Sequence, residues 1–213
     1  MNQTAGNQKT ATHRYLEPPP LLLIISGPSG VGKDTVIAAM REAGLPFHFV
    51  VTSTTRPPRP GEVDGADYVF VERDQFERMI EEDELIEYAV VYGQYKGIPK
   101  QHVRDALASG QDVVMRLDVQ GAETVKRLIP EAISVFLIAP SMEILERRLR
   151  SRKSDTPDQI QVRLAKARAE MEAMERFDFV VPNRESQVDR AVADIAAILR
   201  AERLRVGRPP VSL

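Results

Sequence analysis

A glycine-rich segment near the start of the chain constrains the fold more than any other feature. It runs from Gly27 to Lys33 and reads Gly-Pro-Ser-Gly-Val-Gly-Lys. A continuous apolar run, residues 21–26, precedes it as a predicted buried strand, and a helix is predicted over residues 35–43. Glycines let backbone N–H groups turn inward around phosphate oxygens, and the helix N-terminus adds positive potential. The segment therefore predicts a nucleotide phosphate loop in an α/β domain, with Lys33 on the β and γ phosphates.

The residue after the lysine departs from the phosphate-loop pattern. That pattern places Ser or Thr there as a Mg²⁺ ligand, whereas this chain has Asp34. Aspartate can also ligate Mg²⁺, but it brings negative charge towards a triphosphate. The alternative interpretation is a glycine-rich turn that binds nothing. The predicted ATP-binding residues of this segment are Gly27, Pro28, Ser29, Gly30, Val31, Gly32, Lys33, Asp34 and Thr35, with Asp34 as the candidate metal ligand.

Strand and helix signals recur along the rest of the chain. Strands are predicted at residues 47–52, 68–71, 85–91, 112–117, 133–138 and 179–181, and helices at residues 74–82, 101–108, 141–150, 156–176 and 187–205. Repeated strand–turn–helix units predict a mainly parallel sheet flanked by helices, as in the phosphate-loop NTPase type of α/β fold.

One domain with small inserts fits the length of 213 residues. Residues 1–20 are polar, end in Glu-Pro-Pro-Pro and predict a disordered extension, with a transit peptide as the alternative. Residues 206–213 are a predicted tail. Within residues 21–205 we expect a core of 21–52 and 98–205, an inserted mixed α/β subdomain at about 53–97 and a helical lid at about 150–170.

Composition excludes several kinds of site. The chain has no cysteine, so disulfides and thiolate metal sites are excluded. A net charge of -2 does not predict a nucleic-acid or membrane partner, and the longest apolar run is too short to span a bilayer. We expect a cytoplasmic protein, with an organellar matrix as the alternative.

A run rich in Thr, Arg and Pro follows the second predicted strand. Residues 52–62 read Thr-Ser-Thr-Thr-Arg-Pro-Pro-Arg-Pro-Gly-Glu, and Gly65 and Tyr68 come next. Together with the phosphate loop and the segments 85–89, 118–121 and 147–149, this run closely resembles the guanylate kinases over about residues 21–205. The resemblance implies Mg²⁺-dependent transfer of the terminal phosphate of ATP to GMP, or to dGMP.

The resemblance also implies roles for individual residues. Arg56, Arg59 and Tyr68 would hold the GMP phosphate, while Glu87 would accept hydrogen bonds from guanine N1–H and the 2-amino group. Adenine has neither donor, so Glu87 would reject it. The alternatives are a solvated turn with a core tyrosine and, for Asp118, an ordinary helix N-cap. The implied GMP-binding residues are Thr52, Arg56, Arg59, Glu62, Tyr68, Glu87, Lys96 and Asp118.

Arginines near the lid correspond to the family residues that close over the transferred phosphate. Arg152 and Arg163 would supply this charge, and an ordinary charged helix face is the alternative. Asn183 resembles a family position near the adenine base. The implied catalytic residues are Lys33, Arg56, Arg152 and Arg163.

Three further positions depart from the family pattern. Lys96 replaces a tyrosine that touches the GMP phosphate, and Ile98 replaces a hydroxyl residue near guanine. Arg116 stands where the family has an aspartate. Because strand ends should bring Arg116 close to Asp34, we expect the two to form a compensating pair, with Asp34 organising the Mg²⁺ shell.

Two other functions remain open from the sequence. The Gly-Lys-Asp sequence also resembles kinases of ribose bisphosphates, although these lack the full acceptor run. A non-catalytic guanylate-kinase-like binding module is the other alternative, although such modules typically lose the loop lysine. The sequence leaves the oligomeric state undetermined.

Overall fold

The computed structural model describes residues 18–59, 61–91, 93–150 and 157–213. Its larger sheet has five parallel strands in the order β2-β7-β1-β8-β9. The strands are β1 (Leu22–Ser26), β2 (Phe47–Phe49), β7 (Asp112–Arg116), β8 (Ile133–Ile138) and β9 (Phe179–Pro182). Every residue of the central strand β1 is buried, because helices cover both faces of the sheet. The predicted parallel sheet is confirmed.

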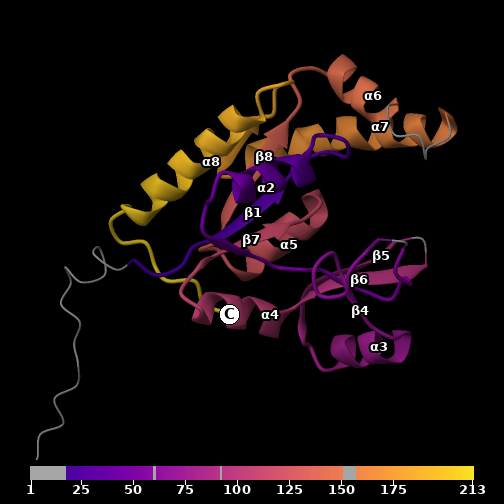
Figure 1. Cartoon of the computed structure of the whole chain (residues 1–213). Helices are drawn as coiled ribbons and strands as arrows, with labels where there is room; N and C mark the ends of the chain where they lie inside the picture. Colours follow the sequence, from indigo (N-terminus) through magenta and orange to yellow (C-terminus); the bar gives the residue numbers. More distant parts are fainter. Residues whose placement is uncertain (1–17, 60, 92, 151–156) are drawn as a thin grey trace, which may run out of the picture.

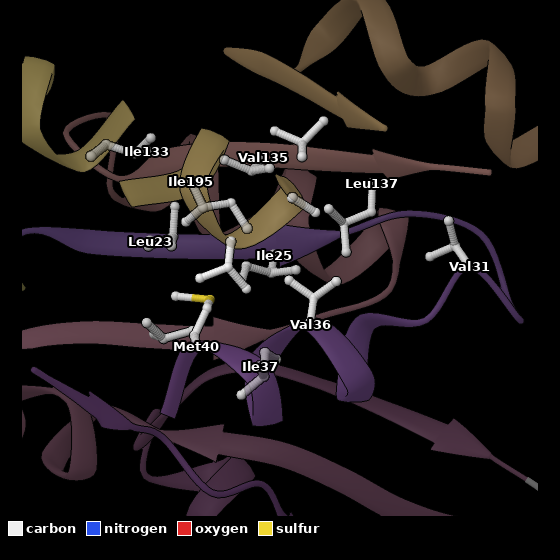
Figure 2. Packing of buried hydrophobic residues seen from close by; sticks show 14 of the residues in the cluster. Leu23, Ile25, Val31, Val36, Ile37, Met40, Ile133, Val135, Leu137 and Ile195 are labelled. Carbon is white, nitrogen blue, oxygen red and sulfur yellow. The ribbon is translucent and has the colours of Figure 1, made fainter. Parts of the chain in front are cut away.

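The helices divide between the two faces of this sheet (Figure 1). The side chains of α2 (Lys33–Glu42), α6 (Met142–Arg150), α7 (Pro157–Met171) and α8 (Val188–Arg203) join one apolar cluster with alternate residues of β1 and β8. Figure 2 shows Leu23 and Ile25 of β1 packed among Val36 and Met40 of α2 and Ile195 of α8. On the opposite face, α4 (Lys100–Ala108) and α5 (Val119–Leu128) pack on Leu22 and Ile24. This packing fixes the loop between β1 and α2 at the carboxyl edge of the sheet.

A second sheet of four short strands lies to one side (Figure 1). Its order is β4-β3-β6-β5, formed by β3 (Ser53–Thr54), β4 (Val69–Phe70), β5 (Leu85–Val91) and β6 (Gln94–Pro99). Helix α3 (Arg73–Glu81) precedes β5. Ile86 and Ile98 of this sheet are buried with α4 and β7, so the smaller sheet and the core share one apolar cluster.

Several boundaries differ from the sequence predictions. Strand β6 was not predicted, because its polar and glycine-containing sequence gains its order from pairing with β3 and β5. Strand β2 ends at Phe49 rather than at residue 52, since the chain then enters the smaller sheet. The last turn before Arg176 is a 3₁₀ helix, η1 (Glu172–Arg176), rather than α-helix. Residue 156, where the helix 156–176 was predicted to begin, and residues 1–17 of the expected extension 1–20 lie outside the described residues.

Within the part of the chain that is described, no helix combines the length and the apolar character needed to cross a membrane.

Candidate active site

The phosphate loop joins β1 to α2 and curls around the side chain of its own lysine. Lys33 Nζ donates to the carbonyl oxygens of Gly27 at 2.6 Å and Pro28 at 3.3 Å. Burial lowers the pKa of Lys33 to about 8, although the nearby carboxylates of Glu170 and Asp34 oppose that shift. A cation held in this way is ready to exchange two carbonyl partners for phosphate oxygens.

Two side chains brace the outer part of the loop. Asn183 is buried and donates from Nδ2 to the Val31 carbonyl oxygen at 2.8 Å, and Arg148 donates to the same oxygen at 3.0 Å. A Cβ at Gly32 would lie 2.5 Å from Asn183 Nδ2, so only glycine fits there. Asn183 therefore supports the loop with its amide group, a role that the sequence did not predict.

Helix α7 contacts the loop at Ser29. Arg163 Nη1 donates to Ser29 Oγ at 3.4 Å, and the Ser29 backbone N–H donates to Glu170 Oε2 at 3.4 Å. The structure thus places Arg163 beside the phosphate loop as expected. The other predicted lid arginine, Arg152, lies outside the described residues. The role of Glu170 was missed, because a carboxylate on a charged helix gives no sequence signal.

The Thr-Arg-Pro run forms a turn organised by an internal ion pair. Arg56 donates from Nη1 and Nη2 to the two carboxylate oxygens of Glu62, each at 2.8 Å, and the Arg59 N–H donates to Glu62 Oε2 at 2.7 Å. The Arg56 hydrogen bond is the main reason that the pKa of Glu62 falls to about 2. Glu62 consequently stays ionised and holds Arg56 in one orientation.

Two cationic side chains of this region lie close to the aromatic ring of Tyr68. The Arg56 guanidinium carbon lies 5.0 Å from the Tyr68 ring centroid, and Lys96 Nζ lies 5.3 Å from it. Lys96 therefore keeps a cation beside Tyr68. Ile98 is fully buried with Ile86 and Val103, so its side chain belongs to the core rather than to a base-contacting wall.

Asp34 and Arg116 form an ion pair, as expected from the two coupled departures in the sequence. The pair connects the first turn of α2 to the carboxyl end of β7. Thr35 is exposed on the same turn. No group of three or more His, Cys, Asp or Glu side chains that could hold a metal occurs in the described ranges.

A cavity of about 720 Å³ lies between β5, α4 and α5, and it contains Glu87 and Asp118. Burial raises the pKa of Glu87 to about 7, and the negative charge of Asp118 adds to the effect. Asp118 Oδ1 also accepts the Gly121 N–H at 2.9 Å, so it is the N-cap of α5 as well as a member of the cavity wall. Thr52 is half-buried, and its carbonyl oxygen accepts the Val69 N–H.

Gly121 is a site residue whose role the sequence did not reveal. A Cβ there would lie 3.2 Å from Glu87 Oε2 and 3.4 Å from Asp118 Oδ1. A side chain at this position would fill the space in front of both carboxylates. The resemblance of the segment 118–121 to the family could have drawn attention to Gly121. The need for a glycine, however, arises only because β5 brings Glu87 against α5 in the folded chain.

Comparison with known proteins agrees with this geometry. The guanylate kinase family model matches residues 20–202. The chain is 51% identical over 197 residues to "Guanylate kinase 2, chloroplastic/mitochondrial" of Oryza sativa subsp. japonica, covering 92% of this chain and 69% of that protein. It is 48% identical over 187 residues to a guanylate kinase of Thermus thermophilus, covering 88% of this chain and 84% of that protein.

A solved structure gives the same result. The crystal structure of guanylate kinase from Anaplasma phagocytophilum superposes with a TM-score of 0.70 at 32% identity and covers 89% of each chain. The family model spans most of the chain, and the matched residues include both the phosphate loop and the two carboxylates in the cavity, Glu87 and Asp118. The chain therefore belongs to the guanylate kinase family.

Proposed function

We propose that this chain transfers the γ-phosphate of ATP to GMP, giving ADP and GDP. The observation that carries the proposal is the cavity that contains the carboxylates of Glu87 and Asp118, of which Asp118 also lies close enough to Lys33 of the phosphate loop to oppose the lowering of its pKa by burial. A half-buried carboxylate accepts hydrogen bonds from guanine N1–H and the 2-amino group, whereas adenine leaves it unpaired. An unpaired buried acceptor can discriminate by roughly 10⁴-fold.

The cations divide between the two nucleotides. Lys33 and Arg163 lie at the loop that would hold ATP, with Arg152 as a further candidate outside the described residues. Arg56, Arg59 and Lys96 would hold the GMP phosphate together with Tyr68. Glu62, an anion bonded to Arg56, acts in this proposal as a positioning residue rather than as a phosphate ligand.

Catalysis then requires alignment and charge stabilisation rather than a covalent intermediate. The GMP phosphate oxygen is already a nucleophile near neutral pH, so the residues need to bring two polyanions together and stabilise the charge of the phosphoryl group in transit. In this proposal Lys33, Arg56 and Arg163 supply the positive charge. Asn183 contributes by keeping the loop in its phosphate-binding conformation.

Mg²⁺ fits the donor set at the loop. The exposed Asp34 carboxylate offers an oxygen ligand, and Mg²⁺ in kinases is typically held by one or two protein groups plus substrate phosphates. The ion would neutralise charge on the β and γ phosphates. Asp34 is therefore the proposed protein ligand.

The deciding experiment is ADP release measured with ATP, Mg²⁺ and one acceptor at a time. GMP should be phosphorylated, dGMP should be tested beside it, and AMP, UMP, CMP and ribose bisphosphate should give background rates. Turnover of ribose bisphosphate in place of GMP would support the rival kinase, and absence of all turnover with retained GMP binding would support a binding module. AMP turnover equal to that of GMP would contradict the role of Glu87.

A further inference from the structure

Arg116 ends strand β7 at the edge of the larger sheet where the phosphate loop begins. In the parallel pairing of β7 with β1, Arg116 lies level with Ile25, two residues before Gly27. Its side chain is 26% exposed, so it has access to solvent from a largely enclosed position. A guanidinium is therefore placed directly beside the loop that would hold the ATP phosphates.

The same guanidinium lies near residues of both nucleotide sites. On the ATP side it pairs with Asp34, which follows the loop lysine. On the GMP side it lies near Tyr68, which contributes to the rise in the pKa of Arg116 and whose ring is close to Arg56 and Lys96. Burial alone would lower the pKa of Arg116, but Asp34 and, more weakly, Tyr68 shift the pKa upwards and keep the side chain charged.

The contact with Asp34 can be exchanged for a phosphate. The Asp34 side chain is 70% exposed, so water can solvate its carboxylate when the ion pair opens. A phosphate dianion offers a guanidinium two parallel charge-assisted hydrogen bonds, which are stronger. Lys33 adds to the preference, since Arg116 lies close enough to repel its positive charge, and a phosphate between them removes that repulsion.

We propose that Arg116 is a further catalytic residue, which contacts the phosphoryl group passing between the two nucleotides, and that Asp34 holds its guanidinium in place before they bind. The proposal rests on the function proposed above. It assigns to this chain a cation at the junction of the two sites, supplied by the larger sheet itself.

Binding of single and joined nucleotides tests the proposal without turnover. Wild type and Arg116→Gln are titrated calorimetrically, in EDTA, with GMP, with ATP and with a compound joining adenosine and guanosine through five phosphates. We expect Kd to rise less than about threefold for each single nucleotide and about a hundredfold or more for the joined compound, because only that compound holds a phosphate between the two sites, whereas each single nucleotide occupies one side of the junction. Equal weakening for all three ligands would overturn the proposal.

Steady-state kinetics separate a catalytic from a positioning role. Arg116→Gln should lower kcat about a hundredfold with little change in either KM, and Arg116→Lys should recover part of the loss because it restores the charge. A loss confined to the KM for GMP would show that Arg116 only positions Tyr68 and would contradict the proposal. Arg176→Gln, which removes an exposed arginine paired with Glu123, is the matched control.

The role of Asp34 is tested by a double-mutant cycle in kcat/KM with Asp34→Ser, Arg116→Asp and the double variant. Strong coupling supports the pairing, and additive losses reject it. Thermal unfolding of every variant excludes loss of fold as the cause. If wild type fails to phosphorylate GMP, the proposed function fails; if wild type is active and Arg116→Gln is equally active, only the inference about Arg116 fails.

Discussion

The carboxylates of Glu87 and Asp118 converge on the same small space, the position in front of the Gly121 Cα. A Cβ built there would approach Glu87 Oε2 to 3.2 Å and Asp118 Oδ1 to 3.4 Å. Burial and the proximity of Asp118 raise the pKa of Glu87 to about 7. Guanine donors would favour the ionised form of Glu87, so ligand binding and proton release are linked.

The affinity for GMP should therefore increase with pH around neutrality. If Glu87 must be ionised to accept two guanine N–H groups, a pKa of about 7 before binding predicts roughly tenfold tighter binding at pH 8 than at pH 6. The measurement is the Kd of GMP across this range for wild type and Glu87→Gln. The phosphate of GMP titrates in both proteins, so the ratio of the two curves isolates Glu87. Parallel curves would contradict the assignment.

Glu87 should also make stability depend on pH in the opposite direction. Its folded pKa of about 7 exceeds the ordinary value of 4.5, so the folded protein binds more protons than the unfolded chain between these values. Its contribution to stability is consequently greatest below about pH 4.5 and declines as the pH rises through 7. The measurement is thermal unfolding of wild type and Glu87→Gln across this pH range without nucleotide. We expect the stability of the variant to fall less than that of wild type between about pH 4.5 and pH 7.

Gly121→Ala should separate stability from GMP binding. Alanine favours helix over glycine by about 1 kcal/mol, so the melting temperature should hold or rise. The added methyl group would crowd the Glu87 carboxylate, and we expect the KM for GMP to rise about tenfold, which corresponds to roughly 1.4 kcal/mol. The KM for ATP is the internal control. A variant with unchanged GMP kinetics would show that guanine binds elsewhere.

Glu62→Gln should weaken GMP binding through Arg56. The amide keeps one acceptor but loses the charge that now engages both Nη atoms of Arg56, so we expect an increase of about tenfold in the KM for GMP, or roughly 1.4 kcal/mol. Because the pKa of Glu62 is near 2, this effect should not vary between about pH 6 and pH 9. Glu77→Gln removes an exposed ion pair with Arg73 in the same subdomain and serves as the control.

Lys33→Ala and Arg59→Ala should each abolish most turnover without unfolding the protein. They remove cations from the ATP and GMP phosphate sites respectively, where losses of about a hundredfold or more in kcat, roughly 2.7 kcal/mol, are typical of lost charge stabilisation. Circular dichroism and the melting temperature report on the fold. Near-normal kcat in either variant would reject the proposed site.

Glu170→Gln should strengthen ATP binding. The Glu170 carboxylate accepts the Ser29 N–H and lies close enough to Lys33 to affect its pKa. Its negative charge would therefore repel an ATP phosphate bound at the loop. Removing that charge should lower the Kd of ATP about threefold, or roughly 0.6 kcal/mol, in EDTA. Glu172→Gln, on the exposed side of the next turn, is the control. Weaker binding would show instead that Glu170 holds α7 in a productive position.

Features that depend on near neighbours along the chain could be predicted from the amino-acid sequence. The phosphate loop, its flanking strand and helix, and the acceptor run around Arg56 are contiguous, and their glycine, proline and charge patterns predict local conformation and chemistry directly. Strand β8 matches its predicted limits because its continuous apolar residues indicate burial, and β5 also matches its predicted limits although Tyr88 and Val90 are exposed. Strand β6 was missed because its order comes from its partners.

The tertiary structure decided which distant groups meet. Asp34 and Arg116 are 82 residues apart and become neighbours only because β7 pairs with β1, although their joint departure from the pattern suggested it. Glu170 and Ser29 are 141 residues apart and left no such signal. The shift in the pKa of Glu87 likewise needs the burial that α5 provides. Local patterns specify elements, but strand order and packing decide the contacts and electrostatics of the site.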